Sequence, residues 1–265
     1  NFFFFFRKAG GNIRKITMIK TFLDKFMAQH WGDLLLLHWP VPQEVLRPTI
    51  PDDLELDLFE GQSWASVVGF HLSGLRIRPF RWIPWGDFHE VNLRTYVQSS
   101  DGKKGVWFHS LDSTDLFAVA GAKGLYGLNY RFASISLAKT NETITYNSRT
   151  RLLKDTAGAH LEGDLDPLSK SSKPSNSPID KFLLERYRFW ASRRWQDHSS
   201  TAEVKHRPYD GYRLKKSSYA GDLFRCQGLP EPDTAPALAH YCRGFSVEAS
   251  APQWVYQMAG QANQR

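Results

Sequence analysis

Hydrophobic and polar positions alternate in short runs along much of this chain. Leu54, Leu56 and Leu58 are separated by other residues, and Glu60-Gly61 forms a tight-turn signal before a second apolar run over residues 64–72. Alternation with a period of two is typical of strands, whose side chains point to opposite faces. The same reasoning predicts further strands at residues 90–97, 105–110, 130–138 and 142–149. We therefore expect a mainly β (α+β) fold, a large and nearly closed antiparallel barrel.

Only a few short segments have the spacing or the capping residues of a helix. One covers residues 43–47 and should end at Pro48. A second follows residues 112–115, DSTD, where Asp112 is expected to cap the helix and Gly124 or Gly127 to end it. Helical spacing returns at residues 179–186. The pattern predicts a barrel that carries short helices rather than a helical layer.

Composition divides the chain into one domain and two extensions. We expect a single barrel domain over residues 27–252, with a loop insertion near residues 156–179 and a tail over residues 253–265. The insertion is rich in Ser, Pro, Lys and Gly, a composition typical of an exposed loop or hinge. Residues 1–26 begin with Asn and five Phe, and we interpret them as a disordered or mistranslated extension with Met18 or Met27 as the true start. A targeting peptide is the alternative, but a secretory signal has its charged region before its apolar run.

The charge distribution argues against a nucleic-acid partner. The formal net charge is +7, and residues 1–26 account for +5 of it through six basic groups and one acid. Residues 27–265 are therefore nearly neutral, and they lack the continuous basic surface expected of a nucleic-acid binder. No run approaches the roughly 20 apolar residues that span a bilayer, so we expect no membrane partner and a cytoplasmic location. The sequence does not decide whether a homo-oligomer forms.

Searches for cofactor and metal sites give no positive signal. The two cysteines, Cys226 and Cys242, indicate no disulfide framework, and the nine histidines show no HxH or HExxH spacing. Phosphate-binding loops and the GxSxG elbow are absent. We expect no metal and no cofactor.

Two segments carry a resemblance to a known family. They are GAKGLYGLNYRFA at residues 121–133 and FHEVNLRTY at residues 88–96, and collinear matches extend from about residue 31 to 252. They resemble the YqjF-like family of uncharacterised proteins, in the acetoacetate decarboxylase-like superfamily. The resemblance implies a β-barrel with an internal ligand cavity. Aligned on Tyr126-Gly127, the chain has Tyr130 and Arg131 where the decarboxylases carry two lysines, which argues against a Schiff-base reaction.

The strand over residues 90–97 is the first candidate site. Glu90, Asn92, Arg94 and Tyr96 share one face, and apolar residues form the other. The polar face either lies on the solvated outside or lines the lumen, where it could bind a small polar ligand. The resemblance favours the lumen, because the decarboxylases place a glutamate on the corresponding strand. Glu90 would then be a catalytic acid, base or orienting group, with Asn92, Arg94 and Tyr96 binding the ligand.

Three further residues complete the candidate site. Tyr130 is a candidate proton donor, and Arg131 offers the bidentate fork of a carboxylate clamp, although both could simply pack at a barrel rim. Arg186 could point into the cavity or tie its helix to the sheet. Lys123 is the nearest amine, and we expect it to be solvated.

These residues support more than one function. The first hypothesis is a barrel that binds a small carboxylate or carbonyl compound of unknown identity, acting as a non-Schiff-base enzyme. The alternative is a non-catalytic ligand sensor or partner-binding protein. A partner surface on the aromatic loop over residues 76–85 predicts an exposed apolar patch there.

Overall fold

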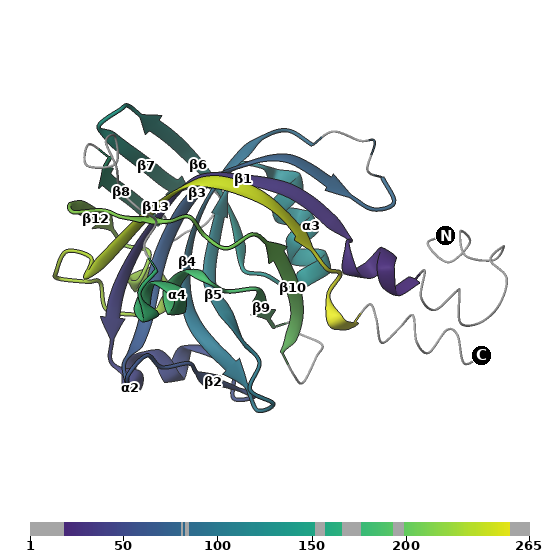
Figure 1. Ribbon diagram of the computed structural model, residues 1–265, viewed down its shortest axis with the longest axis horizontal. Helices are drawn as coiled ribbons and strands as arrows, with labels where there is room; N and C mark the ends of the chain where they lie inside the picture. Colours follow the sequence, from purple (N-terminus) through teal and green to yellow (C-terminus); the bar gives the residue numbers. More distant parts are fainter. Residues whose placement is uncertain are drawn as a thin grey trace, which may run out of the picture.

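The structure of the protein is a computed structural model that describes residues 19–80, 82, 85–151, 157–165, 176–192 and 199–254. Strands dominate it (Figure 1), as the alternating pattern predicts. They are β1 (Met27–Val41), β2 (Leu54–Leu56), β3 (Ser63–Ile77), β4 (Phe88–Ser99), β5 (Lys104–Ser113), β6 (Tyr130–Lys139), β7 (Thr143–Thr150), β8 (Gly158–Asp164), β9 (Arg188–Ala191), β10 (Ser200–His206), β11 (Tyr212–Arg213), β12 (Ser217–Gly221) and β13 (Leu238–Ala249).

Seven of these strands close into a barrel. The order around it is β5, β9, β10, β13, β1, β3 and β4, and β4 pairs with β5 to complete the ring. The barrel predicted from the sequence is therefore confirmed. Every pair is antiparallel except β5 with β9, a parallel ladder in which Val106 lies beside Phe189 and Trp107 beside Trp190. We call this ladder the seam.

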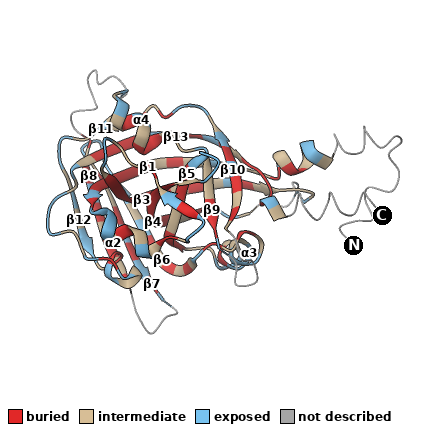
Figure 2. Ribbon diagram, turned by 90° about the horizontal axis from the view of Figure 1, so that it is seen from below, coloured by how far each residue is buried: buried red, intermediate tan, exposed pale blue. Residues whose placement is uncertain are grey.

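A second sheet region covers one outer side of the barrel. Strand β6 runs parallel to β5, and β7, β8 and β12 continue from it. We call strands β6, β7, β8 and β12 the arm. The apolar face of β4, with Val91 and Leu93, packs in one hydrophobic core with Ile144 and Leu161 of the arm. Both faces of β4 are thus buried, one under the arm and one inside the barrel. In Figure 2, strands of the barrel such as β4 are largely buried, whereas most residues of the outer strand β12 are exposed.

The helices are short, and their ends follow side-chain and glycine chemistry. Besides a helix over residues 19–24, the described helices include α2 (Gln43–Leu46), α3 (Leu116–Tyr126) and α4 (Pro178–Leu184), with single 3-10 turns η2 (Arg47–Thr49) and η4 (Arg225–Gln227). Asp115 caps the start of α3, where its carboxylate accepts a hydrogen bond from the Ala118 backbone N–H at 2.6 Å, and Gly127 caps its end with φ 75°. The predicted cap at Asp112 is wrong, because β5 continues through that residue to Ser113.

Two segments are more ordered than the sequence suggested. Strand β8 lies inside the predicted loop insertion, while residues 166–175 fall outside the described part of the chain. Residues 19–24 form a helix, and Leu23 and Phe26 are buried against Ala251. The end of the predicted N-terminal extension therefore belongs to the folded domain, whereas residues 1–18 and 255–265 are not described.

Strand β3 extends to Ile77, so the predicted loop over residues 76–85 is shorter than expected. Phe80 and Trp82 are exposed there, and residues 81, 83 and 84 fall outside the described part. Of the helices that the structure describes, none is long and apolar enough to cross a bilayer.

Candidate functional site

The barrel contains a cavity of about 280 Å³. Its walls are mostly apolar, and they come from strands on all sides of the barrel and from helix α3. This volume lies just below the roughly 300–1,000 Å³ range of small-molecule sites. The cavity is therefore suited to one small ligand.

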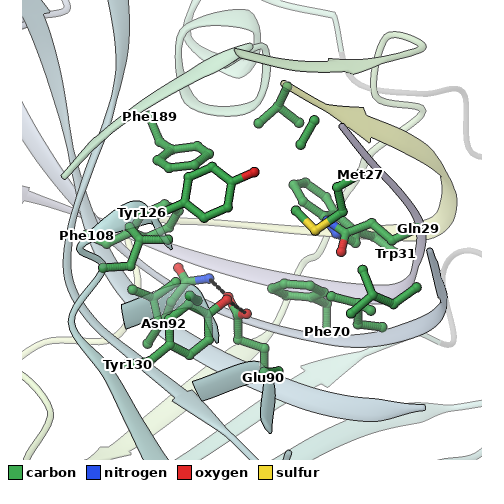
Figure 3. A pocket seen from close by; sticks show the side chains of 18 of the residues that line it. Met27, Gln29, Trp31, Phe70, Glu90, Asn92, Phe108, Tyr126, Tyr130 and Phe189 are labelled. Atoms are coloured by element: carbon green, nitrogen blue, oxygen red, sulfur yellow. Dashed lines mark hydrogen bonds between the residues drawn. The ribbon is translucent and has the colours of Figure 1, made fainter. Parts of the chain in front are cut away.

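Glu90, Asn92 and Tyr130 form a hydrogen-bonded group on one wall of this cavity (Figure 3). The Tyr130 hydroxyl donates to Glu90 Oε2 at 2.6 Å, and Asn92 Nδ2 donates to Glu90 Oε1 at 3.0 Å. Both carboxyl oxygens thus accept a hydrogen bond from the protein. Asn92 Oδ1 has no partner among the described residues and remains available as an acceptor.

The environment of Glu90 brings the pKa of its carboxyl group close to neutral pH. Burial raises the pKa of this carboxyl from its ordinary value of 4.5 to about 7, although the hydrogen bonds from Tyr130 and Asn92 oppose that rise. Burial also raises the pKa of the Tyr130 phenol well above its ordinary value, and the Glu90 carboxylate adds to the effect. Glu90 can therefore give or take a proton near neutral pH, while Tyr130 remains a hydrogen-bond donor.

Arg94 lies four residues beyond Glu90 on the same face of β4 and also lines the cavity. Its side chain is buried, yet Nε and Nη2 have no hydrogen-bond partner among the described residues, and no carboxylate there forms an ion pair with it. A guanidinium is a permanent cation with five N–H donors. Uncompensated buried charge is costly. Such a buried guanidinium is able to bind an anion.

Tyr96 supports Arg94 from outside the cavity. The Cζ atom of Arg94 lies 6.0 Å from the centre of the Tyr96 ring, within range of a cation–π contact. The Tyr96 hydroxyl donates to the Leu183 carbonyl at 3.1 Å and lies 2.7 Å from Ser66 Oγ. Tyr96 does not line the cavity, so the ligand contact predicted for it has no geometric support. Its position makes it a packing surface for the guanidinium.

A buried polar chain continues behind Tyr96. Ser66 Oγ is 2.7 Å from His38 Nδ1, and His38 Nε2 is 3.1 Å from His240 Nδ1. His240 Nε2 then donates to Asp180 Oδ1 at 2.9 Å. Burial lowers the pKa of His38 well below its ordinary value, and the neighbouring His240 adds to this effect. This series of hydrogen bonds fixes the orientation of the Ser66 side chain and, through it, the orientation of Tyr96.

Arg186 combines both of the roles that the sequence left open. It lines the cavity, and it also donates from Nη1 to Asp57 Oδ2 at 2.5 Å and from Nε to the Phe182 carbonyl at 2.7 Å. Burial lowers its pKa, and Asp57 opposes that change. Because Asp57 neutralises it, Arg186 is a weaker anion site than Arg94.

Arg131 and Lys123 lie elsewhere. Arg131 Nε donates to Asp112 Oδ1 at 2.6 Å in a buried ion pair, and the other carboxylate oxygen of Asp112 accepts from Ser148. Neither Arg131 nor Lys123 is part of the cavity wall, and Lys123 is exposed on α3. The position of Arg131 gives no support to the predicted carboxylate clamp.

Several wall residues were not identified from the sequence. Gln29 and Trp31 of β1 lie opposite the Glu90 group, and Tyr126, Phe189 and Tyr209 complete the walls. No sequence signal separates these aromatic residues from ordinary core residues, because the closure of the barrel decides which of them meet. Among the described residues, no cluster of three His, Cys, Asp or Glu side chains is placed to hold a metal.

Comparisons with known proteins agree with this architecture. The family model of DUF2071, described as an uncharacterized conserved protein, matches residues 28–246. The uncharacterized protein YqjF of Bacillus subtilis (strain 168) is 33% identical over 222 residues, which is 83% of this chain and 89% of that protein.

Solved structures of low identity share the fold. Acetoacetate decarboxylase from Legionella pneumophila superposes with a TM-score of 0.58 at 10% identity, covering 85% of this chain and 86% of that one. The enduracididine biosynthesis enzyme MppR, complexed with pyruvate, gives a TM-score of 0.54 at 10% identity and covers 85% and 88%. The chain therefore belongs to the DUF2071 family and has the acetoacetate decarboxylase-like barrel fold.

Proposed function

We propose that the protein binds a small carboxylate inside its barrel, with the carboxylate on Arg94 and the rest of the ligand against the apolar walls. The observation that carries this proposal is the buried Arg94 guanidinium, which lines the cavity with two nitrogens that have no partner among the described residues. A carboxylate matches the planar fork of a guanidinium and would neutralise its charge.

Glu90 adds a capacity for proton transfer to this site. Its pKa of about 7 keeps both protonation states populated near neutral pH, and Tyr130 and Asn92 hold the carboxyl group in place. A bound carbonyl compound could exchange a proton with Glu90, as in general acid–base catalysis. The described cavity wall includes no lysine, so the proposed chemistry uses no amine nucleophile.

The fold neighbours support a carboxylate ligand by analogy alone. The MppR structure contains pyruvate, and the other neighbour is named as a decarboxylase of acetoacetate. Both compounds combine a carboxylate with a carbonyl group. Similarity of fold does not transfer a reaction, so the proposal for this chain depends on Arg94 and Glu90.

Paired ligands test the proposal directly. Thermal shift and titration calorimetry would compare pyruvate, benzoate and octanoate with the corresponding amides, which lack the negative charge. A carboxylate at about 100 times its Kd should add roughly 2.7 kcal/mol to the free energy of unfolding. Replacing Arg94 by glutamine should weaken that binding roughly ten- to a hundredfold, because a charge-assisted hydrogen bond is lost.

Two controls separate binding from folding. Arg149→Gln changes an exposed arginine on β7, outside the cavity wall, and should leave affinity unchanged. Arg94→Gln should be at least as stable as the wild type, because it removes an uncompensated buried cation. The proposal is wrong if amides bind as tightly as acids, if no carboxylate binds, or if Arg94→Gln keeps wild-type affinity.

A further inference from the structure

The two ends of the cavity differ in chemistry. Arg94 marks one end of the stretch of β4 that lines it. Glu90 lies four residues away on the same strand, which corresponds to about 13 Å at the rise of an extended chain. Strand pairing places Ser113 beside Glu90, and α3 starts three residues after Ser113. Helix α3 is therefore at the end of the cavity remote from Arg94.

The walls between the two ends are mostly apolar, apart from Asn92 on β4. Trp31, Leu34, Val68, Phe70, Phe108 and Leu111 line this part of the cavity. Glu90 lies along the same path, but Tyr130 and Asn92 already satisfy its oxygens. A hydrocarbon chain or ring can pass these walls without leaving a new polar group unsatisfied.

Helix α3 leaves room at the remote end. Ala118, Gly121 and Ala122 line the cavity at spacings of three and four residues, which place them on one helix face. A Cβ atom added to Gly121 would meet no atom within 4 Å apart from its own helix backbone and chain neighbours. Phe117, on the same helix, both lines the cavity and is 74% exposed. The cavity therefore opens towards solvent beside α3.

Only one cation of the described cavity wall has no acidic partner. Arg186 is paired with Asp57 and Arg188 with Glu203, whereas Arg94 has no ion pair. One unpaired cation in a mostly apolar cavity, remote from α3, favours a ligand with one negative charge at one end. A dicarboxylate or a phosphorylated sugar would bury further polar groups against hydrocarbon.

We infer that the ligand is an amphipathic monocarboxylic acid whose carboxylate binds Arg94 and whose apolar chain extends along the cavity to α3. This inference rests on the proposed function and adds the class of ligand. It makes Gly121 a specificity-determining residue, because a larger side chain there would occupy the space of the far end of the ligand chain.

A chain-length series provides the test. Calorimetry with butanoate, hexanoate, octanoate and decanoate should show binding that tightens about fourfold for each added methylene, the effect of burying one CH₂ group. Gly121→Leu should weaken octanoate and decanoate binding by roughly tenfold or more through overpacking, and should spare butanoate.

Gly124→Leu is the matched control on the same helix. An added Cβ there also meets no atom within 4 Å, but Gly124 is not part of the cavity wall. Both substitutions replace a helical glycine, so circular dichroism should report an intact and at least equally stable helix in each. Gly124→Leu should leave the whole series unchanged.

The possible failures are distinguishable. Affinity that depends on Arg94 but not on chain length would overturn the inference and leave the proposed function standing. Equal effects of Gly121→Leu and Gly124→Leu would also overturn it. Binding of no carboxylate at all would remove the proposed function together with the inference.

Discussion

Replacing Glu90 by glutamine should make the stability of the protein less dependent on pH. The Glu90 carboxyl is buried, and its pKa rises from 4.5 to about 7 in the folded protein. The folded state therefore holds a proton that the unfolded chain releases above about pH 4.5. This contribution to stability is complete below pH 4.5 and is lost as the pH rises through about 7. The difference between the two pKa values corresponds to roughly 3 kcal/mol.

Urea unfolding at several pH values measures this contribution. Between about pH 5 and pH 8, the free energy of unfolding of the wild type should fall by roughly 2–3 kcal/mol more than that of Glu90→Gln. Glutamine has nearly the same shape and does not titrate, so other groups contribute equally to both curves. Glu142→Gln changes an exposed carboxylate and should reproduce the wild-type dependence.

Parallel pH profiles for the wild type and Glu90→Gln would refute the reasoning. They would mean that Glu90 titrates alike in the folded and unfolded states, and that burial does not favour its neutral form. An opposite sign, with the wild type gaining stability over Glu90→Gln as the pH rises, would mean that the hydrogen bonds from Tyr130 and Asn92 outweigh burial.

Two further predictions concern residues outside the cavity. Arg131→Gln should lower the free energy of unfolding by about 3–5 kcal/mol, because it leaves Asp112 buried without its cation, and denaturant titration would measure this loss. The same variant should keep wild-type affinity for any carboxylate that the protein binds; a weakened affinity would restore the clamp role for Arg131. Asp115→Ala should cost about 1 kcal/mol through loss of the α3 cap. An unchanged melting temperature for that variant would contradict the capping contact.

The composition of the polar face of β4 could be predicted, but its surroundings could not. Alternation correctly placed Glu90, Asn92, Arg94 and Tyr96 on one face, since the strand period is fixed. It could not reveal that the arm strands cover the opposite face, so that both faces are buried. It also could not show that Tyr96 turns away from the cavity, because its hydroxyl contacts Ser66 and Leu183, far away in sequence.

The position of Arg131 depended on a pairing that local patterns do not encode. Residues 112–115 contain four capping side chains, so the end of β5 and the start of α3 were ambiguous in the sequence. Strand β5 extends to Ser113, and its parallel pairing with β6 places Asp112 beside Arg131. That register buries the guanidinium in an ion pair. The resemblance to the decarboxylases could not supply this partner.

The seam between β5 and β9 has a consequence for how the closed barrel behaves over time. Two residue pairs form this ladder, whereas twelve join β1 to β3. Gly105 lies against it so closely that a Cβ atom would come within 2.4 Å of the Arg188 carbonyl oxygen. A short ladder opens at a lower free energy than the whole fold, so amide hydrogens there should exchange early. Each opening turns the closed barrel into an open sheet with unpaired edges on β9 and on the part of β5 that β6 does not cover. Unpaired strand edges are the surface through which β proteins aggregate. The seam is therefore where we expect heat or mutation to start self-association.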